Sequence, residues 1–112
     1  MEEVERLLGR WVKRAIDTVC REACLRTPRV KEAFHYGAIG IDPKHLVIWY
    51  IFRSTSDTAT ARKNGLATFL EERSREVLRT EGYPSEAIET IQVSFASDEE
   101  IHGAGGFRAF FT

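Results

Sequence analysis

One stretch of the sequence decides the fold: residues 46–52 read Leu-Val-Ile-Trp-Tyr-Ile-Phe. These seven consecutive apolar residues are mostly β-branched or aromatic, a composition that favours a buried β-strand over a helix. The run is too short to cross a bilayer, because a membrane-spanning helix needs ~20 apolar residues. Strand side chains alternate between two faces, so both faces of this strand are apolar. We therefore predict a central strand that is covered on both sides.

The sequence before this strand predicts its antiparallel partner, so that residues 34–53 form a hairpin. Phe34, Tyr36 and Ala38 recur at every second position, as in a strand with one buried face. Residues 42–45 read Asp-Pro-Lys-His, and this sequence predicts a turn. Asp suits the first turn position, and Pro fixes the backbone angle of the second.

Two long amphipathic helices flank the hairpin. Residues 3–25 carry apolar side chains at the three- and four-residue spacing of one helical face, and Pro28 ends the pattern. Residues 58–80 predict the second helix, with apolar residues at the same spacing. Gly65 interrupts this second pattern and indicates a kink or a close packing contact.

The end of the chain predicts two further strands. Residues 91–95 alternate between apolar and polar side chains, as in a strand with one wet face. Ser97 and Glu100 have the spacing of a capping box, so we expect a short helical turn there. Residues 107–112 are rich in aromatic side chains and predict a final short edge strand.

These elements predict a single α+β domain over residues 1–112, built as a two-layer sandwich. The expected order is helix, strand, strand, helix, strand, strand, with both long helices on one face of a mainly antiparallel sheet. Two helices cover only one face of that sheet, and an uncovered apolar face usually marks an interface. We therefore expect a homodimer that packs through the sheet. The candidate interface or pocket residues are His35, Tyr36, Val47, Trp49, Tyr50 and Ile51.

Composition and charge limit the function. The chain has 112 residues, of which 43% are hydrophobic and 29% charged, and its net charge of -1 argues against a dedicated polyanion binder. The charge is uneven: residues 1–64 carry 12 Lys and Arg against 8 Asp and Glu, whereas residues 65–112 carry 4 against 9. The acidic start lacks the pattern of a secretory signal, so we expect a cytoplasmic protein without a membrane segment.

Two groups of polar residues suggest a ligand. The outward face of the first predicted helix carries Arg10, Lys13, Arg14 and Arg21. A basic helix face can follow phosphates, but Asp17 interrupts the row and no RNA-reading aromatic motif accompanies it. A solvated face that aids solubility is the alternative, so nucleic acid is a disfavoured partner.

A candidate anion site precedes the second predicted helix at Arg53, Ser54 and Ser56. Hydroxyl groups and free backbone N–H groups meet at such a helix start. Simple helix capping is the alternative, because Ser is among the preferred capping residues.

The sequence predicts no catalytic residues, metal ligands or cofactor-binding residues, so we expect no cofactor and lean against an enzyme. His35, His45 and His102 lack a second ligand at metal-binding spacing. Cys20 and Cys24 lie on the apolar face of the first predicted helix and indicate core packing. The glycine-rich residues 103–106 lack the basic residues of an RNA-binding Gly-x-x-Gly loop and indicate a flexible loop.

Parts of the sequence resemble other proteins. Four segments of the second half resemble a set of small uncharacterised bacterial proteins: Lys63-Asn64-Gly65-Leu66, Gly82-Tyr83-Pro84-Ser85-Glu86-Ala87-Ile88, Ser94-Phe95-Ala96-Ser97 and Gly105-Gly106. That resemblance implies no catalytic residues. The expected order helix, strand, strand, helix, strand is similar to that of ribosome-binding factor A and other type II KH domains. The sequence departs from that family, because its Ala-x-Gly kink between helices is not found at the expected place.

Three functional hypotheses follow from the sequence. The first is a protein-interaction module that self-associates through the apolar sheet face. The second is an RNA- or nucleotide-binding domain that uses the basic face of the first helix. The third is a small-molecule site where His35, Tyr36, Trp49 and Tyr50 meet.

Overall fold

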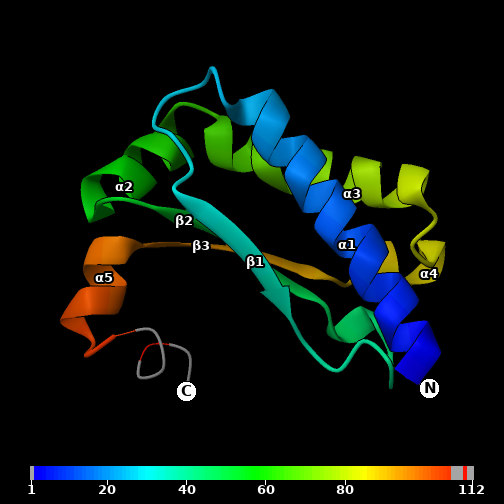
Figure 1. The fold of residues 1–112 in the computed structure, drawn as a ribbon. Coiled ribbons are helices and arrows are strands. Elements are labelled where there is room, and N and C mark those ends of the chain that lie inside the picture. Colours follow the sequence, from blue (N-terminus) through cyan, green and yellow to red (C-terminus); the bar gives the residue numbers. More distant parts are fainter. Residues whose placement is uncertain (1, 107–109, 111–112) are drawn as a thin grey trace.

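The computed structural model of the chain describes residues 2–106 and 110 (Figure 1). The helices of this part are α1 (Glu2–Ala23), α2 (Thr55–Lys63), α3 (Leu66–Glu81), α4 (Ser85–Ile88) and α5 (Asp98–Gly103), with a 3-10 helix over Pro43–His45. The strands are β1 (Glu32–Tyr36), β2 (Val47–Phe52) and β3 (Gln92–Ser97). The mixture of helices and one sheet confirms the α+β class.

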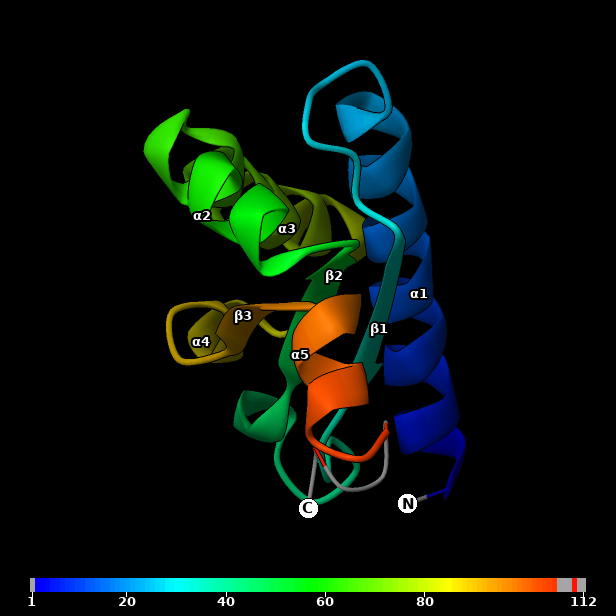
Figure 2. The ribbon, with the colours of Figure 1, turned by 90° about the vertical axis from the view of Figure 1, so that its left-hand side faces the viewer.

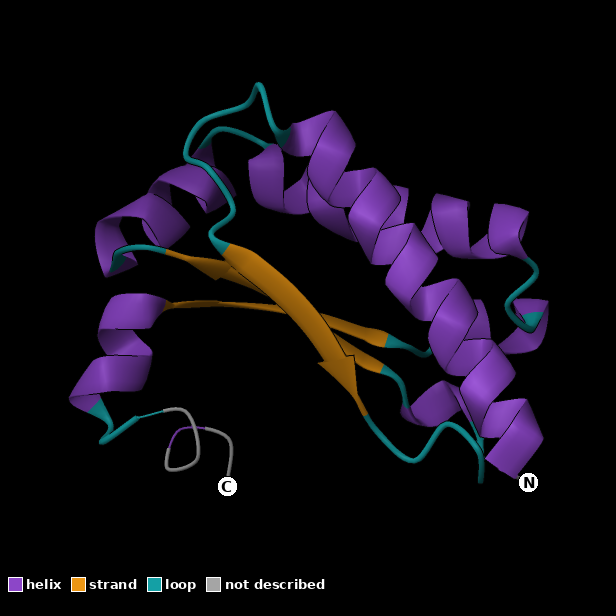
Figure 3. Cartoon of the chain, in the orientation of Figure 1, coloured by secondary structure: helices purple, strands orange, loops and turns teal. Residues whose placement is uncertain are grey.

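The described strands form one sheet in the order β1-β2-β3 (Figure 3). β1 and β2 pair antiparallel, as the hairpin predicted. β2 and β3 pair parallel, so the expectation of a mainly antiparallel sheet is corrected to one antiparallel and one parallel pair. The physical reason is the connection between β2 and β3: the chain crosses over through α2, α3 and α4 and re-enters the sheet in the same direction.

The hairpin connection depends on a glycine. Gly37 has φ +122°, and a Cβ at this position would lie 2.0 Å from the backbone oxygen of His45. The first position of the predicted turn is Asp42, whose carboxylate accepts a hydrogen bond from the Lys44 backbone N–H at 3.0 Å. The two ends of the connection therefore approach more closely than any side chain at position 37 would allow.

The second predicted helix is divided into α2 and α3. Gly65 separates them in the left-handed conformation, with φ +88°. The Asn64 side chain fixes the junction: its Oδ1 accepts from the Leu66 backbone N–H at 3.0 Å, and its Nδ2 donates to the Thr27 backbone oxygen at 2.8 Å. The helical pattern therefore continues through the sequence, while the backbone changes direction at Gly65.

α1 and α3 lie over the same face of the sheet (Figure 2). The main core joins them to β2 through Ile48, Tyr50 and Phe52, each with 0% of its surface exposed. Tyr50 also forms a buried hydrogen bond to Ser74 of α3, with 2.5 Å between the two oxygen atoms. These contacts position the opposite face of the sheet, where the other side chains of β2 project.

The second face is covered by a described helix only at one end. Ile101 of α5 packs there against Ile51 and Ala96 in a separate small core. Figure 1 shows α5 at this end of the sheet, away from α1 and α3. Both faces of β2 are therefore apolar, as the sequence predicted, and α5 is the element that covers part of the second.

The expected final strand over residues 107–112 lies outside the described residues, apart from Phe110. The backbone of Phe110 is helical, and its N–H donates to the Gly106 oxygen at 3.1 Å. Within the described chain, no helix has the length and apolar character needed to span a membrane.

Candidate interaction surfaces

Two cross-strand pairs form an apolar patch on the second face. Phe34 lies directly opposite Trp49, and Tyr36 lies directly opposite Val47. Tyr36 has 44% of its surface exposed, and the other three residues are half-buried. We call these four residues the second-face patch. Three of its members, Tyr36, Val47 and Trp49, belong to the predicted interface. Phe34 was not predicted, although the alternation of β1 places it on the same face as Tyr36.

Aromatic contacts hold the patch together. The rings of Phe34 and Tyr36 have their centroids 6.5 Å apart, and Phe110 packs edge-on against Trp49 at 6.2 Å. Such offset and edge-to-face pairs favour a fixed arrangement of the rings. The patch therefore presents ordered aromatic groups beside the exposed Tyr36.

The structure does not bring His35, Tyr36, Trp49 and Tyr50 together. His35 and Tyr50 project toward the helices, whereas Tyr36 and Trp49 project from the second face. Burial raises the pKa of Tyr50, whose hydroxyl is bound to Ser74. Ile51, the last predicted interface residue, is buried beneath α5. The six predicted residues therefore do not form one site: Tyr50 lies in the main core, Ile51 lies beneath α5, His35 is half-buried on the helix side, and the other three belong to the second-face patch.

His35 lines a hollow of about 280 Å³ between α1 and β1. The residues around it are Lys13, Ile16, Asp17, Ala33, Phe34 and His35. Gly9 of α1 lies beside His35: a Cβ there would make an ordinary contact with His35 Nε2, at 3.9 Å. Burial lowers the pKa of His35, so this imidazole is neutral near pH 7 and offers one donor and one acceptor.

A second hollow of about 250 Å³ lies along the same helix. Its lining residues are Cys20, Ala23, Cys24, Leu25, Arg29 and Val30. Burial, with a smaller contribution from Asp17, raises the pKa of the Cys20 thiol, so a reactive thiolate is disfavoured. We call the two hollows together the α1–β1 groove. The first hollow lies between α1 and β1, and the second lies between the end of α1 and the connection that leads to β1.

The predicted basic face is exposed on α1. Arg14 pairs with Glu81 of α3, with 3.3 Å between Nη1 and Oε1. Arg10, Lys13 and Arg21 form no ion pair with any residue that the structure describes. Three of the four predicted cations therefore remain directed to solvent.

At the predicted anion site, side chains of the protein already accept hydrogen bonds from the backbone N–H groups at the start of α2. Ser54 is the N-cap of α2, and its hydroxyl accepts from the Asp57 backbone N–H at 3.0 Å. The carboxylate of Glu99 accepts from the Thr55 backbone N–H, also at 3.0 Å. Arg53 and Ser56 are exposed. This arrangement favours the capping alternative, because a side-chain carboxylate occupies the place of a bound anion.

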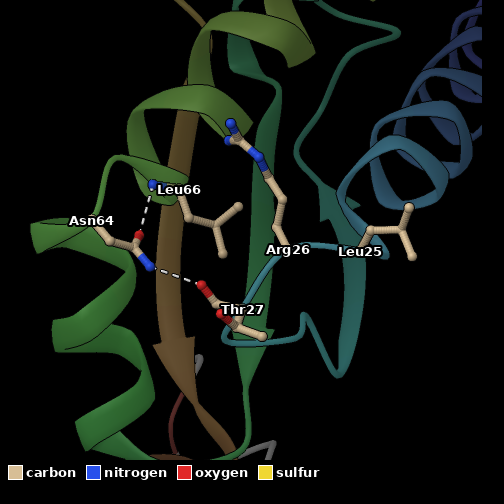
Figure 4. A pocket seen from close by; sticks show the side chains of 5 residues that line it. All are labelled: Leu25, Arg26, Thr27, Asn64 and Leu66. Atoms are coloured by element: carbon tan, nitrogen blue, oxygen red, sulfur yellow. Dashed lines mark hydrogen bonds between the residues drawn. The ribbon is translucent and has the colours of Figure 1, made fainter.

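A third hollow, of about 250 Å³, lies at the end of α1 (Figure 4). Leu25, Arg26, Thr27, Asn64 and Leu66 line it. Asn64 uses both ends of its amide within the chain, and the guanidinium of Arg26 lies 4.1 Å from the centre of the Phe69 ring. These polar groups already have partners within the chain, and they stabilise the α2–α3 junction.

The described residues contain no group of three or more His, Cys, Asp or Glu side chains that could hold a metal ion. Comparison with protein-family models, with curated proteins and with solved structures finds no match for this chain. The geometry of the surfaces is thus the basis for the functional proposal.

Proposed function

We propose that the protein is an interaction module that self-associates through the second-face patch. In this proposal the molecule acts as a two-layer α+β sandwich, and a second copy completes the open end of its second face. The observation that carries the proposal is the 44% exposure of Tyr36, a large aromatic residue that lies in register with Val47.

The surroundings of the patch support this proposal. On the same face, β3 contributes Gln92 and Ser94, which hydrogen bond to each other at 3.1 Å, and β1 contributes the exposed Glu32. An apolar, aromatic centre with a polar rim is typical of specific interfaces. A two-fold axis would bring identical patches together, which is the commonest route to a soluble oligomer.

The test is the oligomeric state as a function of protein concentration, measured by sedimentation equilibrium. We expect a reversible monomer–dimer equilibrium that Tyr36→Lys shifts to monomer, because the change buries a charge in an apolar contact. Leu7→Lys is the matched control, since Leu7 of α1 is similarly exposed at 43% but lies outside the patch. A parent protein that remains monomeric, or a dimer equally sensitive to both changes, would contradict the proposal.

Nucleic-acid binding is the second candidate, favoured by the exposed Arg10, Lys13 and Arg21 on α1. A mixed-sequence single-stranded RNA serves as the probe. If α1 contacts phosphates, binding weakens steeply with salt and with Arg10→Glu. Absence of any complex at low ionic strength excludes this candidate.

A further inference from the structure

We propose that the α1–β1 groove binds an extended acidic peptide, which adds to β1 as a fourth strand of the sheet. The first hollow shares Phe34 with the second-face patch, but the other residues that line the groove lie outside the patch, so this proposal does not require self-association.

The position of β1 supports strand addition. The order β1-β2-β3 places β1 at an edge of the sheet formed by the described strands. Figures 1 and 2 show α1 running beside β1 in the opposite direction. Domains that bind peptides by strand addition use this combination, in which the edge strand supplies backbone hydrogen bonds and adjacent hollows accept side chains.

The spacing of the two hollows fits an extended chain. On α1, the residues that line the second hollow follow those of the first by seven positions, as in Ile16 and Ala23. Seven helical residues span ~10.5 Å. On the other side, the lining moves from Ala33 of β1 back to Arg29 of the connection before it, and four residues span ~13 Å when extended. A peptide with apolar side chains at positions i and i+4, which project to the same side, would therefore reach both hollows.

The charge of the groove selects an acidic peptide. Lys13 lines the first hollow and Arg29 lines the second, and neither forms an ion pair with a described residue. Asp17 is the one acidic side chain among the residues that line the two hollows. Carboxylates on the outward positions of the peptide would meet the two cations, and complementary rim charges direct partner choice.

The experiment selects random heptapeptides, displayed on phage, against the full chain. We expect the enriched sequences to carry Asp or Glu together with apolar residues four positions apart. Fluorescence anisotropy with a synthetic enriched peptide then measures affinity. Lys13→Glu combined with Arg29→Glu should weaken binding by about tenfold or more, and Asp17→Lys should strengthen it. Arg21→Glu, a change to an exposed cation that does not line the groove, is the matched control and should have little effect.

Three results would overturn the inference. The first is a selection without enrichment. The second is an enriched peptide whose affinity does not respond to the three groove changes; the gain expected from Asp17→Lys cannot be imitated by misfolding. The third is a mixed-sequence RNA that binds more tightly than the peptide and loses affinity with Lys13→Glu, which would assign the surface to nucleic acid. Val47→Lys changes a patch residue on β2 rather than on the docking strand β1, and should weaken self-association but leave peptide binding intact, so the two proposals fail separately.

Discussion

Tyr50 and Ser74 form the most buried polar contact between the sheet and α3. The Ser74 hydroxyl donates its single hydrogen to the Leu70 backbone oxygen at 2.5 Å, so Tyr50 is the donor in the bond that joins the two side chains. Ser74→Ala removes the acceptor and leaves the buried hydroxyl of Tyr50 without this hydrogen-bond partner. We expect the free energy of unfolding, measured in urea, to fall by about 1–3 kcal/mol.

A double-mutant cycle tests this direction of donation. Tyr50→Phe leaves the Ser74–Leu70 hydrogen bond intact. It should therefore lower the free energy of unfolding by less than Ser74→Ala does, by about 1 kcal/mol. The double variant contains no orphaned hydroxyl, so its loss should be smaller than the sum of the two single losses. Strictly additive losses would show that the two hydroxyl groups are energetically independent.

The burial of His35 leads us to expect that the folded protein loses stability in mild acid. Burial lowers the pKa of His35 in the folded protein below its ordinary value of 6.5, so the unfolded chain takes up this proton more readily. The resulting stability is present above pH 6.5 and is lost as the pH falls toward the folded pKa. Lys13 and Asp17 are the charged residues that line the same hollow.

The measurement is the free energy of unfolding between about pH 7 and pH 5. Between these two pH values the free energy of unfolding should fall more in the parent protein than in His35→Gln, which has no imidazole to protonate. His45→Gln changes an exposed histidine and should retain the parent's pH dependence. An equal slope for the parent protein and His35→Gln would remove His35 as the cause.

At the scale of elements, the junction of α2 and α3 requires glycine at position 65 because of its backbone conformation, and not because a side chain would lack space. A Cβ added at Gly65 would meet nothing within 4 Å, but the residue has φ +88°. Gly65→Ala should therefore lower the free energy of unfolding by about 1 kcal/mol through strain alone. Gly103→Ala is the control, because Gly103 is helical and equally open. That change should be neutral or slightly stabilising, and equal losses at the two glycines would refute the explanation by strain.

Periodicity predicted the elements whose faces are set locally. It placed α1, the β1–β2 hairpin and β3 within a few residues of their observed bounds, and it showed that both faces of β2 are apolar. It did not give the parallel pairing of β3, because strand direction depends on the path of the whole connection through α2, α3 and α4. It also missed the first hollow of the α1–β1 groove, whose lining residues come from α1 and β1, which only tertiary packing brings together.

At the scale of the whole molecule, the uneven charge of the two halves is partly matched within the chain. Arg14 pairs with Glu81, and Lys31 pairs with Asp98. Exposed ion pairs of this kind contribute little stability each, about 0–1 kcal/mol. Their positions nevertheless explain why a basic first half does not require an external polyanion.

The two tryptophans report on different surfaces and can locate a self-association interface. Trp49 belongs to the second-face patch, whereas Trp11 packs beside Gly82, where an added Cβ would lie 3.8 Å from its ring. In Trp11→Phe, Trp49 is the remaining indole. If copies associate through the patch, its emission should move to shorter wavelength as protein concentration rises, because water leaves the interface.

Adding Tyr36→Lys to Trp11→Phe should remove this concentration dependence. In Trp49→Phe, the emission of Trp11 should stay constant at every concentration. A shift in Trp11 instead would place the contact on the opposite side of the molecule, beside the α1–α3 layer. The concentration at which Trp49 responds also gives the dissociation constant of the dimer, and therefore the free energy of association.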